Sequence, residues 1–304
     1  MKIHFVSFMI IAMIANSGDS APIQKNIVNI DSNTSNEDQQ TKVFITGNTS
    51  NGSQSNNISQ SNNNAKGSQS NEASIQDNKA KSQENQIVQT KNNANDQSNS
   101  SQIKGNKAID AQRNQVLNNN NSATNNQANT ASTLSNTANG SQSNAVQLKS
   151  NSAAKDQSNK AGIGGNHSST QGNMIDVSDN SAKENEENLS FVFLNKSKGA
   201  QNNNCQEKGN TASNQNNKCE VTDNASDGNQ VNSASIAENT ASSQQNTGKV
   251  SNNRANGSQN NAAQVAENGA QKTQNNNLDF FGNAASGDQQ NNANIFSNFA
   301  LWKN

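Results

Sequence analysis

The segment from Asn136 to Gln157 reads NTANGSQSNAVQLKSNSAAKDQ, and its pattern runs through nearly the whole chain. An Asn is followed two residues later by Ala, six residues later by Gln, and then by a second Asn two residues after that Gln. We call the first residue the repeat Asn; it recurs every 14 or 15 residues. Its positions are Asn48, Asn63, Asn78, Asn92, Asn106, Asn121, Asn136, Asn151, Asn166, Asn180, Asn195, Asn210, Asn224, Asn239, Asn253, Asn268, Asn283 and Asn298. So regular a repeat decides the fold class before other features are considered.

Each repeat has a part of variable length and a part of constant length. The Gln follows its own repeat Asn by five residues in the shorter repeats, such as Asn78 to Gln83, and by six in the others. From that Gln to the next repeat Asn, the spacing is always nine residues. A segment that tolerates deletion is typical of a turn, whereas constant spacing indicates a strand in fixed register. A second turn is expected just before each repeat Asn, where Gly, Asn and Asp are common, as at Gly47 and Asp77.

Alternate residues of the constant part have a common chemical character. They are the Gln, which we call the ladder Gln, an Asn (the strand Asn), a small or apolar residue (the small position) and a mostly apolar residue (the apolar position). Alternate residues of a strand face one side, so these four predict an inward face. Nearly all charged residues fall on the other face or in turns, and Glu186 and Glu207 are the only acids at inward positions.

These features predict an all-β, single-chain β-solenoid of about 18 rungs, with 14–15 residues and one repeat per rung. Rungs stacked about 4.8 Å apart would make a rod of roughly 85 Å. Like residues would lie above like, so that Asn and Gln amides form hydrogen-bonded ladders rather than remaining unpaired at a cost of about 1–3 kcal/mol each. The residues expected in these ladders include Asn63, Asn106, Asn121, Asn136, Asn151, Asn210, Asn268, Asn71, Asn144, Gln69, Gln142 and Gln157.

Composition alone favours a different interpretation. Only 28% of the 304 residues are hydrophobic and 3% are aromatic, which is typical of a disordered, secreted Asn/Gln-rich protein. A disordered chain has no reason to keep a fixed repeat spacing, and this argues for the solenoid. The formal net charge of −1 gives no electrostatic reason to expect nucleic acid as a partner.

The ends of the chain differ from the array. Residues 1–17 resemble a signal peptide, with Lys2 before an apolar run from Phe5 to Ala15; a retained membrane anchor is the alternative. We expect residues 18–40 to be a polar disordered tail, residues 41–300 the repeat array, and residues 301–304 the C-terminal end. The mature chain is then extracellular and has no membrane contact after the signal peptide is removed.

The two cysteines, Cys205 and Cys219, occupy the small position of consecutive repeats. Stacked rungs would bring them within disulfide range, and two buried free thiols are the alternative. Aromatic residues gather near the ends of the array, among them Phe44, Phe296, Phe299 and Trp302. Because solenoid ends expose unpaired strand groups, these residues are expected either to cap the ends or to contact another molecule.

The unit Asn-x-Ala-x-x-x-Gln, as at Asn136 to Gln142 and Asn151 to Gln157, resembles the second half of the repeat in curlin, the bacterial curli amyloid subunit. The resemblance covers residues 43–300 and implies stacked strand–turn–strand units in extracellular fibres. The repeat here is shorter, lacks the Ser-x5-Gln opening and occurs many more times. Convergence on the same stacking geometry would account for the likeness as well as common ancestry does.

No residue pattern indicates an enzyme. The chain has two His, and no Ser/His/Asp set, metal-ligand cluster or phosphate-binding loop is found, so we expect no catalytic residues, no metal and no cofactor. The first interpretation is a secreted structural protein of a fibre, silk, adhesive or coat, which associates with itself end to end or side by side. An ice-binding solenoid is the main alternative, although no outward column of Thr is present.

Overall fold

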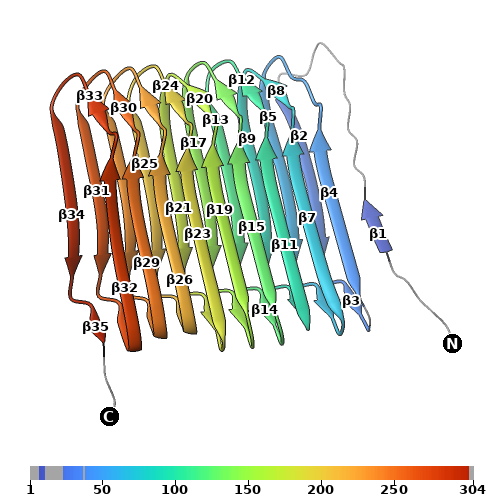
Figure 1. Cartoon of the computed structure of the whole chain (residues 1–304). Coiled ribbons are helices and arrows are strands. Elements are labelled where there is room, and N and C mark those ends of the chain that lie inside the picture. Colours follow the sequence, from blue (N-terminus) through green and yellow to red (C-terminus); the bar gives the residue numbers. More distant parts are fainter. Residues whose placement is uncertain (1–6, 11–22, 37, 301–304) are drawn as a thin grey trace.

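The computed structural model describes residues 7–10, 23–36 and 38–300, and all of their regular structure is β. Two long parallel sheets face each other and run from one end of the molecule to the other (Figure 1). Sheet A consists of β4 (Gln39–Thr46), β7 (Ser68–Gln76), β11 (Asp96–Lys104), β15 (Gln127–Leu134), β19 (Gln157–Gly164), β23 (Asn185–Phe193), β26 (Thr211–Thr222), β29 (Thr240–Ser251) and β32 (Gly269–Phe281). Sheet B consists of β2 (Ile23–Asp31), β5 (Ser53–Ser61), β9 (Ser82–Thr90), β13 (Gln112–Asn119), β17 (Ser141–Lys149), β21 (Thr170–Ser178), β25 (Gln201–Lys208), β28 (Gln230–Ala237), β31 (Gln259–Ala266) and β34 (Gln289–Phe296).

Two-residue strands close the narrow edges between the sheets, directly after most of the repeat Asn residues; after Asn210, Asn239 and Asn268 this segment is the beginning of β26, β29 and β32. After strands of sheet B they are β3 (Thr34–Ser35), β6 (Asn64–Ala65), β10 (Asn93–Ala94), β14 (Ser122–Ala123), β18 (Ser152–Ala153), β22 (Ser181–Ala182) and β35 (Phe299–Ala300). After strands of sheet A they are β8 (Lys79–Ala80), β12 (Lys107–Ala108), β16 (Thr137–Ala138), β20 (His167–Ser168), β24 (Lys196–Ser197), β27 (Ala225–Ser226), β30 (Arg254–Ala255) and β33 (Ala284–Ala285). The chain is therefore a flattened, all-parallel β-solenoid, which confirms the predicted fold class.

The number of repeats in a turn differs from the prediction. Each long strand pairs in register with the strand 28–30 residues further on, as Arg113 of β13 does with Ser143 of β17, so one turn contains two repeats. The molecule has about nine turns rather than 18 rungs, and it is about 45 Å long rather than 85 Å. The reason is strand length: an eight-residue strand spans about 26 Å, and the six or seven residues left in one repeat cannot return over that distance.

The array begins earlier than predicted. Ile23–Asp31 forms β2 and pairs with β5, and Thr34–Ser35 forms β3, within the segment 18–40 that was expected to be a disordered tail. Gln24, Asn26 and Asn33 occupy the positions of the ladder Gln, strand Asn and repeat Asn, so this segment is stabilised by the same stacking as every later repeat. Of the predicted signal peptide, only β1 (Ser7–Ile10) is described, and it pairs with β4. Residues 301–304 lie outside the described residues.

The corner before each repeat Asn has a left-handed backbone. Gly occupies some of these corners, such as Gly105 with φ of 65°, but Asp77 (54°) and even Leu194 (53°) adopt the same conformation. Left-handed backbone is favourable for Gly and tolerable for Asn and Asp, whereas it is strained for Leu. The second predicted turn is thus present, and its shape is imposed by stacking even where the residue does not favour it.

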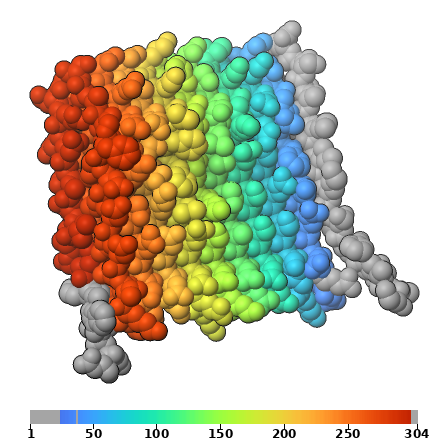
Figure 2. Space-filling model, viewed as in Figure 1, coloured from blue at the N-terminus to red at the C-terminus, as the bar shows by residue number. Residues whose placement is uncertain are grey.

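The interior is thin and partly apolar. Side chains from the apolar position, such as Ile75, Ile163 and Ile236, are fully buried between the sheets and form one continuous cluster along the axis. In the space-filling view, the residues follow one another as bands from the N-terminal to the C-terminal end (Figure 2). Each turn therefore packs mainly on the turns before and after it, as in other solenoids.

Candidate functional site

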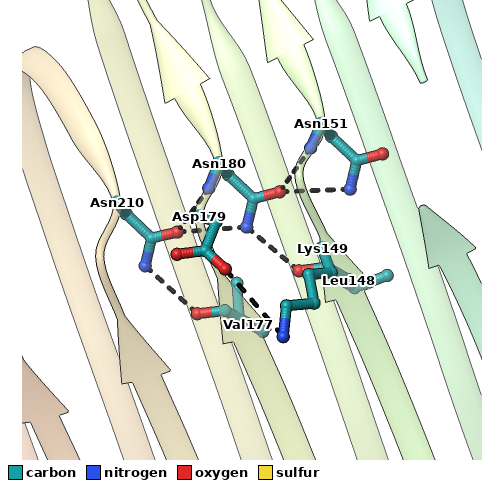
Figure 3. Close-up of polar contacts among 7 residues, drawn as sticks. All are labelled: Leu148, Lys149, Asn151, Val177, Asp179, Asn180 and Asn210. Atoms are coloured by element: carbon teal, nitrogen blue, oxygen red, sulfur yellow. Dashed lines mark hydrogen bonds and ion pairs between the residues drawn. The ribbon is translucent and has the colours of Figure 1, made fainter. Parts of the chain in front are cut away.

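The repeat Asn residues stand at the corners of each turn, where they bind the turns to one another. The Oδ1 of Asn180 accepts hydrogen bonds from the backbone N–H of Asn151 (3.0 Å) and from its Nδ2 (3.1 Å) (Figure 3). The Nδ2 of Asn180 donates to the carbonyl of Leu148 (3.0 Å) and to Oδ1 of Asn210 (3.1 Å). All the capacity of this buried amide is used. Asp would lack the donors, which explains why no other residue type stands at this position.

Two further ladders run inside the sheets, in opposite directions. Each ladder Gln donates from Nε2 to the ladder Gln of the preceding turn, as Gln142 does to Gln112 (2.9 Å). Each strand Asn donates from Nδ2 to the strand Asn of the following turn, as Asn144 does to Asn173 (2.8 Å). The two ends of the array therefore present different groups: a ladder ends in a donor at one end of the molecule and in an acceptor at the other.

All the residues named from the sequence as ladder members lie in these ladders. Each forms a hydrogen bond with a side chain one turn away, which is two repeats away in the sequence rather than one; they are Asn63, Asn71, Asn106, Asn121, Asn136, Asn144, Asn151, Asn210, Asn268, Gln69, Gln142 and Gln157.

Glu186 interrupts the Gln ladder of sheet A. It accepts hydrogen bonds from Gln215 (3.3 Å) and Asn188 (3.1 Å), and on its other side the Oε1 of Gln157 is buried without a partner. Burial raises the pKa of Glu186 to about 8, although the hydrogen bonds from Asn188 and Gln215 act against this. A neutral carboxyl has one O–H donor, which is what the unpaired oxygen of Gln157 requires. The site therefore favours a protonated Glu186 at neutral pH.

The second buried acid, Glu207, lies in β25 of sheet B, the long strand that follows β23 and its Glu186. Burial raises its pKa well above the ordinary range, and the nearby charge of Glu186 raises it further. The hydroxyl of Ser190 and the backbone amide of Lys218 lower this pKa, but neither carboxyl oxygen has a hydrogen bond of ordinary geometry. Two carboxyls in one dry interior cannot both ionise cheaply, so this is the part of the core most sensitive to pH.

Cys205 and Cys219 form a disulfide with a Cα–Cα distance of 5.9 Å. The bond does not join stacked rungs, as the sequence spacing suggested. Cys205 lies in β25 of sheet B and Cys219 in β26 of sheet A, so the disulfide crosses the interior within one turn. Small positions of consecutive repeats face each other between the sheets, and this places the two thiols together.

The ladders are incomplete at the N-terminal end. The Nε2 of Gln24 and the Nδ2 and Oδ1 of Asn48 are buried but have no hydrogen-bond partner. The Oδ1 of Asn26 likewise receives no hydrogen bond from a strand Asn before it, because β2 is the first strand of sheet B among the described residues. Gln24 and Asn26 were not predicted as ladder residues, although their spacing to Asn33 matches the repeat.

The C-terminal end is exposed to solvent. Every residue of β34 is exposed, and Ile295 (53%) and Phe296 (43%) are among the large apolar side chains that solvent reaches. Phe281 at the end of β32 is also exposed (50%). Of the aromatic residues predicted at the ends, Phe44 lies half-buried in β4 and Phe296 lies exposed in β34; Phe299 lies in β35, and Trp302 falls outside the described residues.

A shallow groove of about 1320 Å³ follows the beginnings of the strands of sheet A along the whole array. Its walls are the residues on either side of each ladder Gln, including Asp38, Asp96 and Asp156. Asp38 accepts a hydrogen bond from Ser68, Asp96 from Asn126 and Asp156 from Asn185, each in the next turn of sheet A. These carboxylates are thus used to join turns.

Comparisons with known proteins found no family model, no curated protein and no solved structure that matches the chain. Among the described residues, no group of His, Cys, Asp or Glu could hold a metal ion. The described part of the chain has no helix long and apolar enough to cross a membrane. The geometry of the stacked ladders and of their open ends is therefore what carries the functional argument.

Proposed function

We propose that this chain is a secreted structural protein that builds an extracellular fibre or coat by amyloid-like stacking of its copies. The incomplete ladders at the N-terminal end and the exposed last strand at the C-terminal end are the observations that carry the proposal. In the middle of the array each repeat Asn is fully hydrogen-bonded, whereas at the N-terminal end Asn48 has an unused donor and acceptor. A parallel sheet edge with unsatisfied backbone and amide groups is a template for a further strand.

The distribution of residue types between inward and outward positions supports the same role. Regular chemistry is found at inward positions, where the amide ladders and Ile column lie, while the outward positions of neighbouring turns vary from Arg113 to Ser143 to Gly172. A scaffold needs a uniform interior and tolerates a varied surface. The resemblance to curlin, whose stacked units make extracellular fibres, agrees with this proposal.

The test is to purify the chain from residue 18, which retains every turn of the array, and to follow it over time by electron microscopy and fibre diffraction. Unbranched fibres with a meridional spacing of about 4.8 Å are expected. Thermal hysteresis is measured on the same sample. A protein that stays monomeric at all concentrations would contradict the proposal, and a monomer that also shapes ice crystals would favour the ice-binding alternative.

A further inference from the structure

We propose that the two ends of the array form one complementary interface, on which a second copy stacks after rotation by half a turn about the long axis. This rests on the proposed function, because it specifies how copies would join in the fibre. Three features of the molecule support it: the direction of each ladder, the number of half-turns, and the pairing of β1 with β4. A half-turn here means one long strand with the corner and short strand that follow it.

The ladders end in complementary groups. Gln274 and Gln289 donate to the preceding turn, so their Oε1 atoms remain as acceptors at the C-terminal end. At the N-terminal end, Gln24 has an unpaired Nε2 donor. The strand Asn ladder has the reverse polarity: Asn276 accepts from Asn246 and keeps its Nδ2, while Asn26 donates to Asn56 and keeps its Oδ1. The Gln ladders, and the strand Asn ladder where it meets β2, can therefore continue from one molecule into the next without a change of direction, whereas β4 has Thr41 at the strand Asn position.

The number of half-turns determines how the next copy must be oriented. In the chain from residue 18, which lacks β1 of sheet A, sheet B has ten long strands and sheet A has nine, so this chain begins and ends in sheet B and has 19 half-turns. An unrotated copy of this chain would place its β2 beside β34 in sheet B and leave a gap one strand wide in sheet A, the position that β1 occupies beside β4 in the longer chain. A copy rotated by half a turn instead places its β2 beside β32 and its β4 beside β34, and the coil continues without a gap.

This rotation is permitted because both halves of a turn are built from the same repeat. In the rotated stack Gln274 meets Gln24, Asn276 meets Asn26 and Asn283 meets Asn33 of the next copy. Beside β34, the pairs are Gln289 with Gln39, Ala293 with Val43, Ile295 with Ile45 and Asn298 with Asn48. Outward residues also fit, since Asn275 would lie beside Lys25 and Asn292 beside Lys42. Within these strands no directly opposed pair brings like charges together; in the turns just before β34 and β4, Asp288 would lie beside Asp38.

The edge of β4 already accepts a strand in this manner. β1 lies parallel to β4 with Ser7 beside Gln40 and Ile10 beside Val43. This is the edge that β34 of a preceding copy would use. The chain that retains residues 1–17 should therefore elongate more slowly than the chain from residue 18, because β1 competes for the same backbone groups.

Cysteine pairs at the two ends distinguish the orientations. In Lys25→Cys/Asn275→Cys, rotated stacking places the two thiols on adjacent strands about 4.8 Å apart at Cα, within disulfide range. In the control Lys25→Cys/Gln290→Cys, the same stacking places them on opposite faces. All three side chains are exposed and outward, and the native cysteines are already joined to each other. Within one molecule the engineered thiols lie at opposite ends and cannot meet.

After oxidation of assembled protein, a non-reducing gel should show a ladder of covalent multimers for Lys25→Cys/Asn275→Cys and monomer for the control. Multimers from the control pair alone would overturn the rotation but leave the proposed function standing. Fibres that cross-link in neither variant would overturn end-to-end stacking. If neither variant nor the unmodified chain assembles, the proposed function itself fails.

Discussion

The middle and the ends of this molecule contain the same residues at the same positions, but those residues are in different states. Asn180, in the middle, uses its whole amide in hydrogen bonds, while the side chain of Asn48, at the N-terminal end, has none. Ile236 is fully buried, while Ile295, at the same apolar position of the last described repeat, is 53% exposed. The difference teaches that an inward side chain contributes fully to the stability of the fold only when a turn lies on both sides of it.

The comparison also separates two roles. Interior turns provide stability, which accumulates along the stack because each turn contacts its neighbours. The terminal turns keep unsatisfied groups that another molecule can complete. Matched substitutions in the middle and at the ends should therefore affect different measurements: denaturation of the monomer in the first case and assembly in the second.

The largest effect is expected at the apolar position. Ile236→Lys would place an unpaired charge between the sheets and should reduce the free energy of unfolding by more than about 4 kcal/mol. Ile295→Lys, at the exposed end, should change it by less than about 1 kcal/mol but should slow fibre growth. Chemical denaturation and a seeded growth assay measure the two effects. Equal losses of stability in both variants would contradict the distinction between middle and end.

A somewhat smaller effect is expected at the repeat Asn. Asn180→Leu would remove the partners of Asn151, Asn210 and the Leu148 carbonyl, and should destabilise the monomer by about 3–4 kcal/mol. Asn48→Leu is the matched control, because its side chain has no hydrogen bond to lose. It should leave the denaturation midpoint nearly unchanged. A midpoint for Asn180→Leu close to that of the control would show that the ladder does not contribute as described.

An effect that depends on pH is expected at Glu186, where an acid replaces the ladder Gln. The pKa of Glu186 is raised from 4.5 to about 8, so between these values the folded state binds more protons than the unfolded state. The free energy of unfolding must then fall as pH rises through this range, by up to about 1.4 kcal/mol per pH unit. Glu186→Gln restores the ladder Gln and removes this contribution, while the part due to Glu207 remains.

We therefore expect Glu186→Gln to match the unmodified protein near pH 4 and to exceed its stability by several kcal/mol, up to about 4–5 kcal/mol, at pH 8–9. Denaturant titrations at several pH values give the result. Glu187→Gln, on the outward face, serves as the control and should leave the pH profile unchanged. A variant at position 186 that is no more stable than the unmodified protein at pH 9 would rule out the neutral, buried acid.

Much of this fold could be predicted from the sequence, because inward residues are chosen by burial and hydrogen bonding. The strand from Gln142 to Leu148, its inward face and the amide ladders all follow from alternation and constant spacing. The disulfide between Cys205 and Cys219 could also be expected, although the reason was wrong: the thiols face each other across one turn.

The number of repeats per turn was predicted incorrectly because a repeat in sequence need not be a full turn in space. Stacking makes Asn151 meet Asn180, and nothing in the identity of these two residues shows that Asn166 lies between them on the opposite edge. The useful signal was strand length, since one strand of eight residues requires another of equal length to return. The first half-turn, from Gln24 to Asn33, was missed because the composition around it looked disordered.

The central claim is that each turn contains two repeats, and a pair of cysteine variants tests it directly. Arg113 and Ser143 lie side by side on β13 and β17, 30 residues apart, whereas Ala128, 15 residues from each, lies on β15 in the other sheet. Oxidation should form an intramolecular disulfide in Arg113→Cys/Ser143→Cys and none in Arg113→Cys/Ala128→Cys, as peptide mapping of the monomer would show. A disulfide in the second variant and none in the first would contradict the account, since it would mean that successive repeats stack directly on one another.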